Sequence, residues 1–567
     1  MKEDQKNIVL FALIAVLLLF GWPYAANWLF PQQQPAAQVV NGKQVPQPLP
    51  AAAAPAALRE RDAVLADGPR VAIETPAFKG SINLKGARLD DLVLVNYDET
   101  TAKNSPKVHL LSPSGAQGAY FAEFGWAGAG VQAPNANTMW QASGTKLTPT
   151  TPVTLTTKNS SGQVFRIDLS VDQEYMFTIR QTVANLGQAP ISVTPYASVS
   201  RADRSKDAGQ WAARVGPIAQ TASESHYLGW KDVETTPLSY QTTGGWTGFT
   251  DHYWLTTLIP DQRVPVTLGQ RQNPSKAYQA DYQLAQPLTV APGKQTSYSS
   301  HFFAGAKEVK TLESYQAKLG IVQFSRAIDW GWFELVEKPI FYYLDWLFHL
   351  VGNFGVAIIL LTITIRGLLF PIAHKQFESM ARMRVVQPKM KALQERHKDD
   401  KQRQQQEIMK LYKEEKVNPL AGCLPILLQI PIMFALYKVL LLTIEMRHQP
   451  FVLWIHDLSA PDPATILNLF GYLPYTLPSF LAIGVVPVLL GVSMYFQMKF
   501  NPAPMDEVQK QVFAIMPWML MFMMAPFAVG LQLYWITSNC ITILQQQWLY
   551  SRHPVLKQAI KKDAPAK

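Results

Sequence analysis

The strongest constraint on the fold of this chain is a series of mainly apolar runs whose lengths approach or match that of a membrane-spanning helix. Such a helix needs about 20 predominantly apolar residues. Charged residues make up only 16% of the chain, against roughly 25% in soluble domains. The runs are Ile8–Trp22, Leu347–Ile372, Leu420–Thr443, Leu477–Gln497 and the long stretch Val512–Leu549, which Pro526 and Gly530 divide into a helical hairpin. We therefore predict a polytopic α-helical membrane protein with six spans.

The first apolar run follows a short polar start containing Lys2 and Lys6, a pattern shared by cleaved signal peptides and retained anchors. We predict a membrane anchor over residues 1–30, because the run ends in aromatic residues suited to a membrane interface. Cleavage near Ala25 is the alternative. Residues 31–57 are rich in proline, alanine and glutamine, which predicts a flexible linker.

Residues 58–325 differ from the apolar runs because apolar and polar side chains alternate along them. The clearest case is FRIDLSVD at 165–172, whose period of two predicts a half-buried strand. Turn residues at 159–162 and 185–187 bound this strand and its successor. We predict a large all-β domain, built as an antiparallel sandwich. Its many serines and threonines are typical of a solvated sheet face, with carbohydrate binding as the alternative.

The remaining chain divides into an interfacial segment, a membrane core and a tail. Residues 326–346 mix charges with aromatic side chains, which is typical of an amphipathic helix lying in a membrane interface. Residues 347–550 form the predicted five-span core. Within it, 373–418 is rich in helix formers, and Pro388 is predicted to divide it into the arms of a cytoplasmic helical hairpin. Residues 551–567 form a basic tail.

The placement of basic residues predicts the orientation of the spans, because lysine and arginine are retained on the cytoplasmic side. The segment from Ile372 to Leu420 holds twelve Lys/Arg, whereas 444–476 holds only Arg447. The tail from Leu549 holds five Lys/Arg. Both termini are therefore predicted to be cytoplasmic, and the domain 58–325 periplasmic.

Enzymatic function is not predicted. No phosphate-binding loop, dinucleotide-binding glycine pattern, zinc helix motif or nucleophile elbow stands in a suitable context. No catalytic carboxylate pair can be identified by spacing in the β domain. The only cysteines, Cys423 and Cys540, lie in apolar segments and offer neither a disulfide framework nor a metal site. We expect no cofactor and no metal.

Arg366 is the most informative single residue, because an arginine inside an apolar span is costly and marks a functional site by default. No acidic residue lies in the same run, and Gly355 and Thr362 project from the same helical face as Arg366. This predicts the wall of a water-containing substrate groove. The alternative is that Arg366, close to Pro371, snorkels to the cytoplasmic headgroups.

The last span carries a polar stripe that could form the opposite wall of this groove. Its members follow helical spacing and are Gln532, Trp535, Asn539, Thr542 and Gln546. Gln429, between two prolines of an earlier span, is a further groove candidate. The alternative for the stripe is hydrogen bonding between helices, and the two roles are compatible.

Basic residues near the cytoplasmic hairpin and in the tail are candidates for ribosome contact, since lysine and arginine bind RNA phosphate. They are Lys398, Lys401, Arg403, Lys557, Lys561 and Lys562. An ordinary solvated charged helix is the alternative for the hairpin.

Three sequence blocks resemble the YidC family of membrane protein insertases. They are NPLAGCLP at 418–425, PFVLWIHDLSAPDP at 450–463 and LYWITSNCITILQQQ at 533–547. The resemblance covers the core from about 345 to 550, and the anchor with its large periplasmic domain resembles the Gram-negative form. One departure is that the frequent Pro-Ser-Gly-Leu turn of the family stands here as Ala528-Val529-Gly530-Leu531.

The resemblance implies an energy-independent insertase and chaperone that works alone or with the Sec translocon. It implies a groove open to cytoplasm and lipid, whose arginine Arg366 matches, and a β-supersandwich as the periplasmic fold, shared with sugar-binding enzymes. The implied partners are nascent membrane proteins, the Sec translocon, the ribosome and membrane lipids. A small-solute transporter is one rival, although no paired inverted repeats are visible. A membrane-anchored carbohydrate-active protein is another.

Overall fold

The computed structural model describes residues 58–207, 213–397, 400–415, 424–467, 469–470, 473, 482–500 and 507–552. The predicted anchor 1–30, the linker 31–57 and nearly all of the tail lie outside these ranges. The described chain divides into two compact units. One contains the residues up to Gly331 together with Leu442–Glu445, and the other contains Trp332–Leu441 and the residues from Met446 onward.

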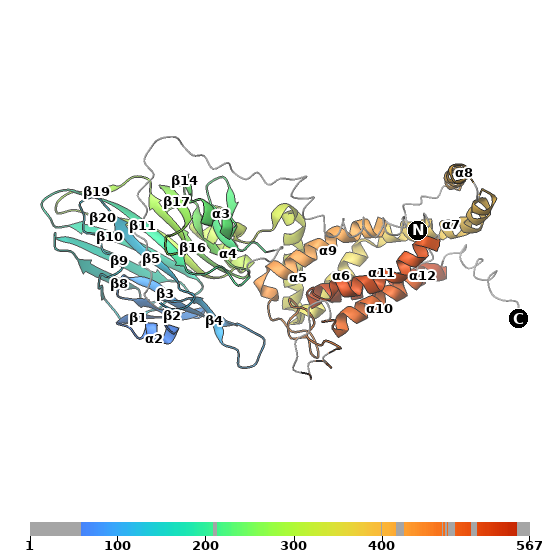
Figure 1. Ribbon diagram of the computed structural model, residues 1–567, viewed down its shortest axis with the longest axis horizontal. Coiled ribbons are helices and arrows are strands. Elements are labelled where there is room, and N and C mark those ends of the chain that lie inside the picture. The colour runs from blue at the N-terminus through green and yellow to red at the C-terminus, as the bar shows by residue number, and fades with distance from the viewer. Residues whose placement is uncertain are drawn as a thin grey trace. The chain divides into compact units, whose positions relative to one another are not determined.

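The first unit is built from two large β-sheets (Figure 1). The larger sheet has the order β14 (Leu238–Thr243), β17 (Pro265–Gln272), β18 (Tyr278–Leu284), β11 (Ile191–Arg201), β5 (Tyr120–Ala127), β3 (Arg88–Asp98), β2 (Phe78–Asn83), β1 (Arg70–Glu74) and β7 (Lys146–Leu147), with β19 (Leu288–Val290) beside β11 and β4 (Lys107–Leu111) beside β3.

The second sheet has the order β13 (Ser225–Tyr227), β12 (Gly216–Gln220), β15 (Trp246–Thr250), β16 (Trp254–Ile259), β20 (Gln295–Ala306), β10 (Met176–Asn185), β9 (Gln163–Val171), β8 (Val153–Lys158) and β6 (Gln141–Ala142). Short helices complete the unit: α2 (Arg61–Leu65), α3 (Trp230–Thr235), α4 (Val309–Leu319) and the 3₁₀ turns η1 (Phe324–Ala327) and η2 (Gly331–Phe333).

The β9 strand illustrates how the alternating sequence produces this fold. Phe165, Ile167, Leu169 and Val171 are all buried, while the residues between them are partly or fully exposed. β9 pairs antiparallel with β10, and the buried faces of the two sheets meet in an aromatic core. Phe78 of the larger sheet and Phe177 of the second stack with ring centroids 5.3 Å apart. The predicted large all-β domain is confirmed.

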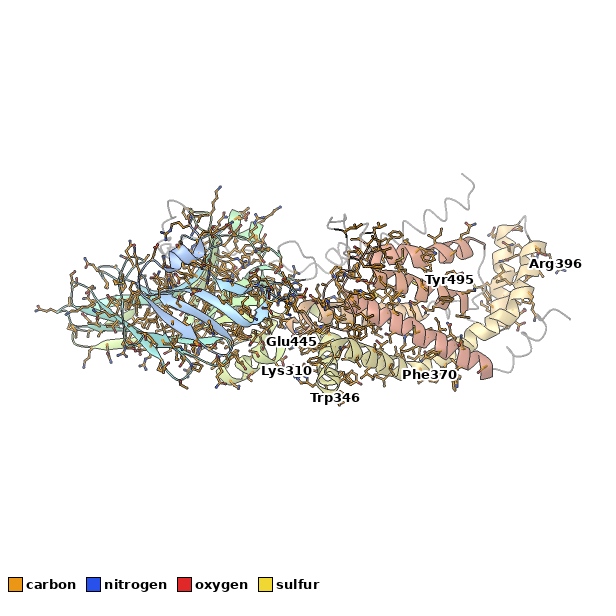
Figure 2. The ribbon with its side chains drawn as sticks, turned by 90° about the horizontal axis from the view of Figure 1, so that it is seen from below. Lys310, Trp346, Phe370, Arg396, Glu445 and Tyr495 are labelled. Carbon is orange, nitrogen blue, oxygen red and sulfur yellow. The ribbon has the colours of Figure 1, made fainter. Side chains whose placement is uncertain are left out.

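The second unit is helical (Figures 1 and 2). Its elements are α5 (Glu334–Val351), α6 (Phe354–Leu368), α7 (Phe370–Arg396), α8 (Lys401–Glu414), α9 (Leu424–Leu442), α10 (Val485–Phe500), α11 (Glu507–Met524) and α12 (Val529–Arg552), and the 3₁₀ turn η4 (Ile444–Met446) follows α9 at the boundary of the two units. The predicted division of the last apolar stretch is observed, since α11 and α12 are separated by residues 525–528. Among the described residues, no helix combines the length and apolar character needed to cross a membrane.

The prediction of one continuous helix over Leu347–Ile372 is wrong. The helix α5 runs on to Val351 and ends at Gly352, which has a φ of 70°, a backbone conformation that glycine adopts without strain. Asn353 then starts α6, because its side-chain oxygen accepts a hydrogen bond from the Val356 backbone nitrogen. The predicted interfacial segment 326–346 is accordingly α-helical only from Glu334.

Pro388 does not divide the hairpin, contrary to the prediction. The helix α7 continues through Pro388 to Arg396. A proline inside a helix removes one backbone hydrogen bond, and α7 tolerates this loss. The first arm, α7, instead ends at Arg396, and the second, α8, begins at Lys401. Asp400 caps α8 there by accepting a hydrogen bond from the Arg403 backbone nitrogen at 3.0 Å.

Candidate functional site

Arg366 lies in the last turn of α6 and contacts two other helices of its unit. Its Nε donates to the Ser538 hydroxyl of α12 at 2.9 Å, and its Nη2 contacts the same hydroxyl. Nη2 also donates to Oε1 of Gln429 on α9 at 3.3 Å. One guanidinium therefore joins three helices that are separated by tens of residues in the sequence.

Gln429 extends this contact into a short chain of hydrogen bonds. Its Nε2 donates to the Tyr534 hydroxyl at 2.8 Å. Tyr534 is buried on α12, one helical turn before Ser538. Because an amide offers both an acceptor and a donor, Gln429 can accept from Arg366 and donate to Tyr534 at the same time.

The hydrogen-bond partners of Arg366 are all electrically neutral. Among the described residues, none of its polar contacts is to a carboxylate. A hydroxyl and an amide oxygen satisfy guanidinium donors without cancelling the charge, and arginine does not lose its proton in proteins. The side chain is only partly buried, and its neutral partners hold a full positive charge in place.

Four other predicted groove residues are more deeply buried and have partners of their own. Thr362 and Thr542 each donate to a carbonyl of their own helix at 2.7 Å. Gln532 donates to the carbonyls of Met524 and Phe527, at 3.0 and 2.9 Å, which satisfies the end of α11. Asn539 donates to the Ser493 hydroxyl of α10 at 2.9 Å.

These contacts correspond to hydrogen bonding within and between helices, the alternative that the sequence left open for the stripe. A role of these residues in contacting clients stays a prediction. Trp535 is partly exposed and Gln546 is buried. Arg366 and Gln429 are the two predicted groove residues that the structure brings into direct contact.

The ribosome-contact candidates are described only in part. Arg403 is exposed on α8. Lys401 lies at the start of α8, and its side chain is outside the described part of the chain, as are Lys398, Lys557, Lys561 and Lys562 in full. The hairpin has a small apolar contact between its arms, in which Val386 of α7 and Leu411 of α8 are buried. Ribosome binding by these residues stays a prediction.

Ser538 and Tyr534, the α12 residues that complete the Arg366 network, were not among the predicted groove residues. They lie beside the predicted stripe, about 100° around the helix from Asn539 and Trp535. The available signal was their spacing of four residues, which places a hydroxyl from each on one helical face. A search for small hydroxyl side chains facing the arginine would have found Ser538.

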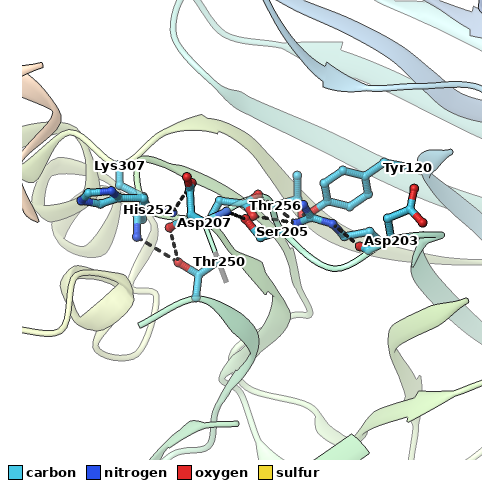
Figure 3. A network of polar contacts seen from close by, with 10 residues as sticks. Tyr120, Asp203, Ser205, Asp207, Thr250, His252, Thr256 and Lys307 are labelled. Carbon is cyan, nitrogen blue, oxygen red and sulfur yellow. Dashed lines mark hydrogen bonds and ion pairs between the residues drawn. The ribbon is translucent and has the colours of Figure 1, made fainter. Parts of the chain in front are cut away.

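The β unit contains a separate polar network (Figure 3). Arg201 donates to both carboxylate oxygens of Asp251 at 2.9 Å, and the buried Lys307 donates to the Thr250 hydroxyl at 3.0 Å. Next to it is a small cavity lined by residues 213–217, 227–229 and Thr250. None of these lining residues is acidic, so the cavity lacks the carboxylates that glycoside chemistry uses.

Comparisons with known proteins cover nearly the whole described chain. The family profile "YidC periplasmic domain" matches residues 70–343, and "60Kd inner membrane protein" matches residues 346–557. A membrane protein insertase YidC from Zymomonas mobilis is 47% identical over 560 residues, covering 97% of this chain and 96% of that protein. One from Methylobacterium nodulans is 43% identical over 602 residues, covering 100% and 99%. A crystal structure of an active YidC insertase covers 84% of this chain and 94% of its own, at 18% identity and a TM-score of 0.37.

Proposed function

This chain belongs to the YidC family of membrane protein insertases, and we propose that its insertion mechanism depends on the positive charge held at Arg366. The protein is a membrane protein insertase of a bacterial inner membrane, with a large all-β periplasmic domain. Its substrates are nascent membrane proteins, and its function is not enzymatic.

The difficult step of insertion is moving the polar segment of a client through hydrocarbon. An acidic residue at the centre of a membrane costs about 3 kcal/mol on insertion scales, and unpaired polar backbone adds to this. A fixed positive charge part-way across lowers that free energy for acidic segments, because it supplies a partner where water is scarce. Arg366 takes this role in the proposed mechanism, with Gln429 and Ser538 as its positioning residues.

The observation that carries the proposal is that Arg366 is held by neutral partners on α9 and α12. A carboxylate partner would neutralise the site before a client arrived. A purely snorkelling arginine would direct its N–H donors toward the headgroups. Here the guanidinium donates instead to side chains of the neighbouring helices α9 and α12.

The route by which a client leaves is proposed to follow the exposed apolar residues around this network. Ile363 and Leu368 flank Arg366 on α6, and Ile430 follows Gln429 on α9, and all three are exposed. An apolar client helix can pack on such residues and then move into lipid without crossing a polar barrier. The polar segment and the apolar helix of a client are thus handled by adjacent surfaces.

We propose the six-span orientation, with both termini cytoplasmic. Two observations support it. Basic residues concentrate in the hairpin and the tail. In addition, the starts of α6, α10 and α12 all form hydrogen bonds with one segment, 451–462. The proposed topology requires these three helices to begin on the same side of the membrane. The domain limits 58–325, 326–346 and 347–550 belong to this proposal. Action with the Sec translocon and docking of the ribosome at the hairpin and tail are proposed as well.

Site-specific crosslinking of a ribosome-bound nascent membrane protein tests the proposed path. A photoreactive residue at Trp535 should crosslink the client. A matched probe at Leu544, on the opposite face of α12 and 65% exposed, should crosslink much less. Equal crosslinking from both positions would refute a path along the Arg366 side of α12. A solute transporter would give no client crosslink from either.

A further inference from the structure

The connection between α9 and α10 holds together the starts of three helices. The side chain of Asn353, the cap of α6, donates to the Phe451 carbonyl at 3.1 Å. The backbone nitrogens of Val529 and Gly530, which begin α12, donate to the carbonyls of Ala460 and Leu458 at 2.9 Å. The two backbone bonds satisfy donors that a helix start leaves unpaired, so residues 451–460 are bonded to the starts of α6 and α12.

Two aspartates stabilise the connection from within. Asp462 accepts hydrogen bonds from the Trp454 indole and the Ala464 nitrogen at 3.0 Å and from the Val486 nitrogen, in the first turn of α10, at 2.7 Å. Asp457 accepts from the backbone nitrogens of His448 and Ser459 and from the Ser459 hydroxyl. Both carboxylates are thus directed inward. Through these hydrogen bonds Asp462 connects Trp454 to Ala464 and to the first turn of α10.

The connection presents large apolar side chains outward at two turns. Leu453 is 79% exposed, Leu469 is 55% exposed and Phe470 is 54% exposed. All three have positive φ angles, of 56°, 52° and 60°, a conformation that branched and bulky residues rarely adopt. A water-facing turn would place glycine or asparagine at such positions. Here the backbone strain is retained at residues whose side chains have no role in the core.

The second of these turns lies in an uncharged stretch of the sequence. The sequence has no Asp, Glu, Lys, Arg or His between Asp462 and Lys499. Ile466, which is also exposed, donates its backbone nitrogen to the Ile483 carbonyl just before α10. One turn into α10, Leu489 is exposed as well. The exposed Ile466 of the second turn is thus bonded to the segment just before α10, a helix that itself exposes Leu489.

We infer that these two turns form a lipid-binding surface, which inserts into the membrane leaflet at the end of the helical unit where α6, α10 and α12 begin. Leu453, Leu469 and Phe470 would contact acyl chains just below the headgroups, where apolar side chains on a polar framework partition favourably. The surface would hold the starts of these helices at a fixed depth, because the same connection bonds to all three. This inference goes beyond the insertion mechanism and does not depend on the charge of Arg366.

Fluorescence depth measurements on the full chain test this inference. In a background with Cys423→Ser and Cys540→Ser, single cysteines are introduced as Leu453→Cys and Leu469→Cys. Each is labelled with the environment-sensitive dye NBD and reconstituted in phosphatidylcholine and phosphatidylglycerol vesicles, at less than one protein per vesicle. The matched control is Leu186→Cys, which is 62% exposed in a turn of the β unit.

The dye at 453 and 469 should emit at shorter wavelength than at 186. Lipids with a doxyl group near the headgroup should quench it at least twofold more than at 186, and more strongly than lipids with a deep doxyl group. Emission and quenching equal to those at 186 would overturn the inference. Shielding that appears only when a ribosome-bound client is added, or only at protein densities that permit dimers, would assign the surface to a client or to a second copy and would equally overturn it.

Discussion

Lys307 provides a quantitative test of the packing in the β unit. It follows β20, is 5% exposed, and donates to the Thr250 hydroxyl at 3.0 Å. Burial lowers the pKa of Lys307 from the ordinary 10.5 to about 8, although Asp251, Asp207 and Asp329 nearby favour the charged form. The folded state thus holds this proton less tightly than the unfolded state.

The sign of the pH dependence follows directly. Below about pH 8 the ammonium is charged in both states, and the folded state carries the full desolvation penalty. Between about pH 8 and 10.5 the folded state has released the proton while the unfolded state still binds it, so stability rises with pH. At 1.36 kcal/mol for each pKa unit, the whole rise is about 3 kcal/mol, of which about 1.5 kcal/mol falls between pH 8 and 9.5.

Reversible urea unfolding of the β unit, produced as residues 58–331, measures this rise. Buried tyrosines of the unit, whose pKa values burial raises, oppose this rise over the same range, because they ionise first in the unfolded state. The Lys307 contribution is therefore the difference between the parent protein and Lys307→Met, which should grow by about 1.5 kcal/mol in favour of the parent between pH 8 and 9.5, whereas the difference between the parent and Lys294→Met, at an exposed position, should stay constant. A parent-minus-Lys307→Met difference that does not change over this range would refute the proposed burial of a charged lysine.

Three further predictions concern the helical unit and its topology. Gly355→Ala should lower the melting temperature in detergent by several degrees, because the new Cβ would overlap the Phe451 ring and overpacking costs about 1–3 kcal/mol. Adding Phe451→Leu should restore part of the loss. An unchanged melting temperature in Gly355→Ala would contradict this packing. Reporter domains fused after residues 200 and 460 should read periplasmic, and fusions near 395, near 505 and at the C-terminus cytoplasmic, so a cytoplasmic signal at 200 would overturn the topology. Deleting 395–415 should weaken ribosome binding and reduce its salt dependence, as measured by sedimentation at several salt concentrations, and binding that is unchanged across salt would remove the docking proposal.

Local patterns in the sequence were sufficient where one periodicity dominates. The alternation at 165–171 predicted the buried face of β9 because a strand places successive side chains on opposite sides. The isolation of Arg366 in an apolar run, with no acidic neighbour to pair with it, predicted a functional role, and that role stays a prediction. Gln429, which contacts Arg366, was also among the predicted groove residues, although the sequence could not specify the hydrogen bond between the two side chains.

The features that the sequence analysis missed depend on contacts between distant segments. Gly355 was assigned to the wall of the groove, yet it is buried with the Phe451 ring against it, a contact across almost a hundred residues. Pro388 was expected to break a helix, but its local penalty is too small to prevent α7 from continuing. Conversely, Gly352 ends a helix inside an apolar run that hydropathy alone presents as continuous. Local propensity does not decide such cases.

The most direct test of the central claim is insertion by Arg366 variants at matched protein levels. One client carries Asp or Glu in its translocated segment, and a second carries neutral residues at the same positions. Arg366→Lys keeps the charge and should retain much of the activity toward both. Arg366→Ala should reduce insertion of the acidic client about tenfold, equivalent to roughly 1.4 kcal/mol, and affect the neutral client much less. Near-normal and equal insertion of both clients by Arg366→Ala would contradict the account.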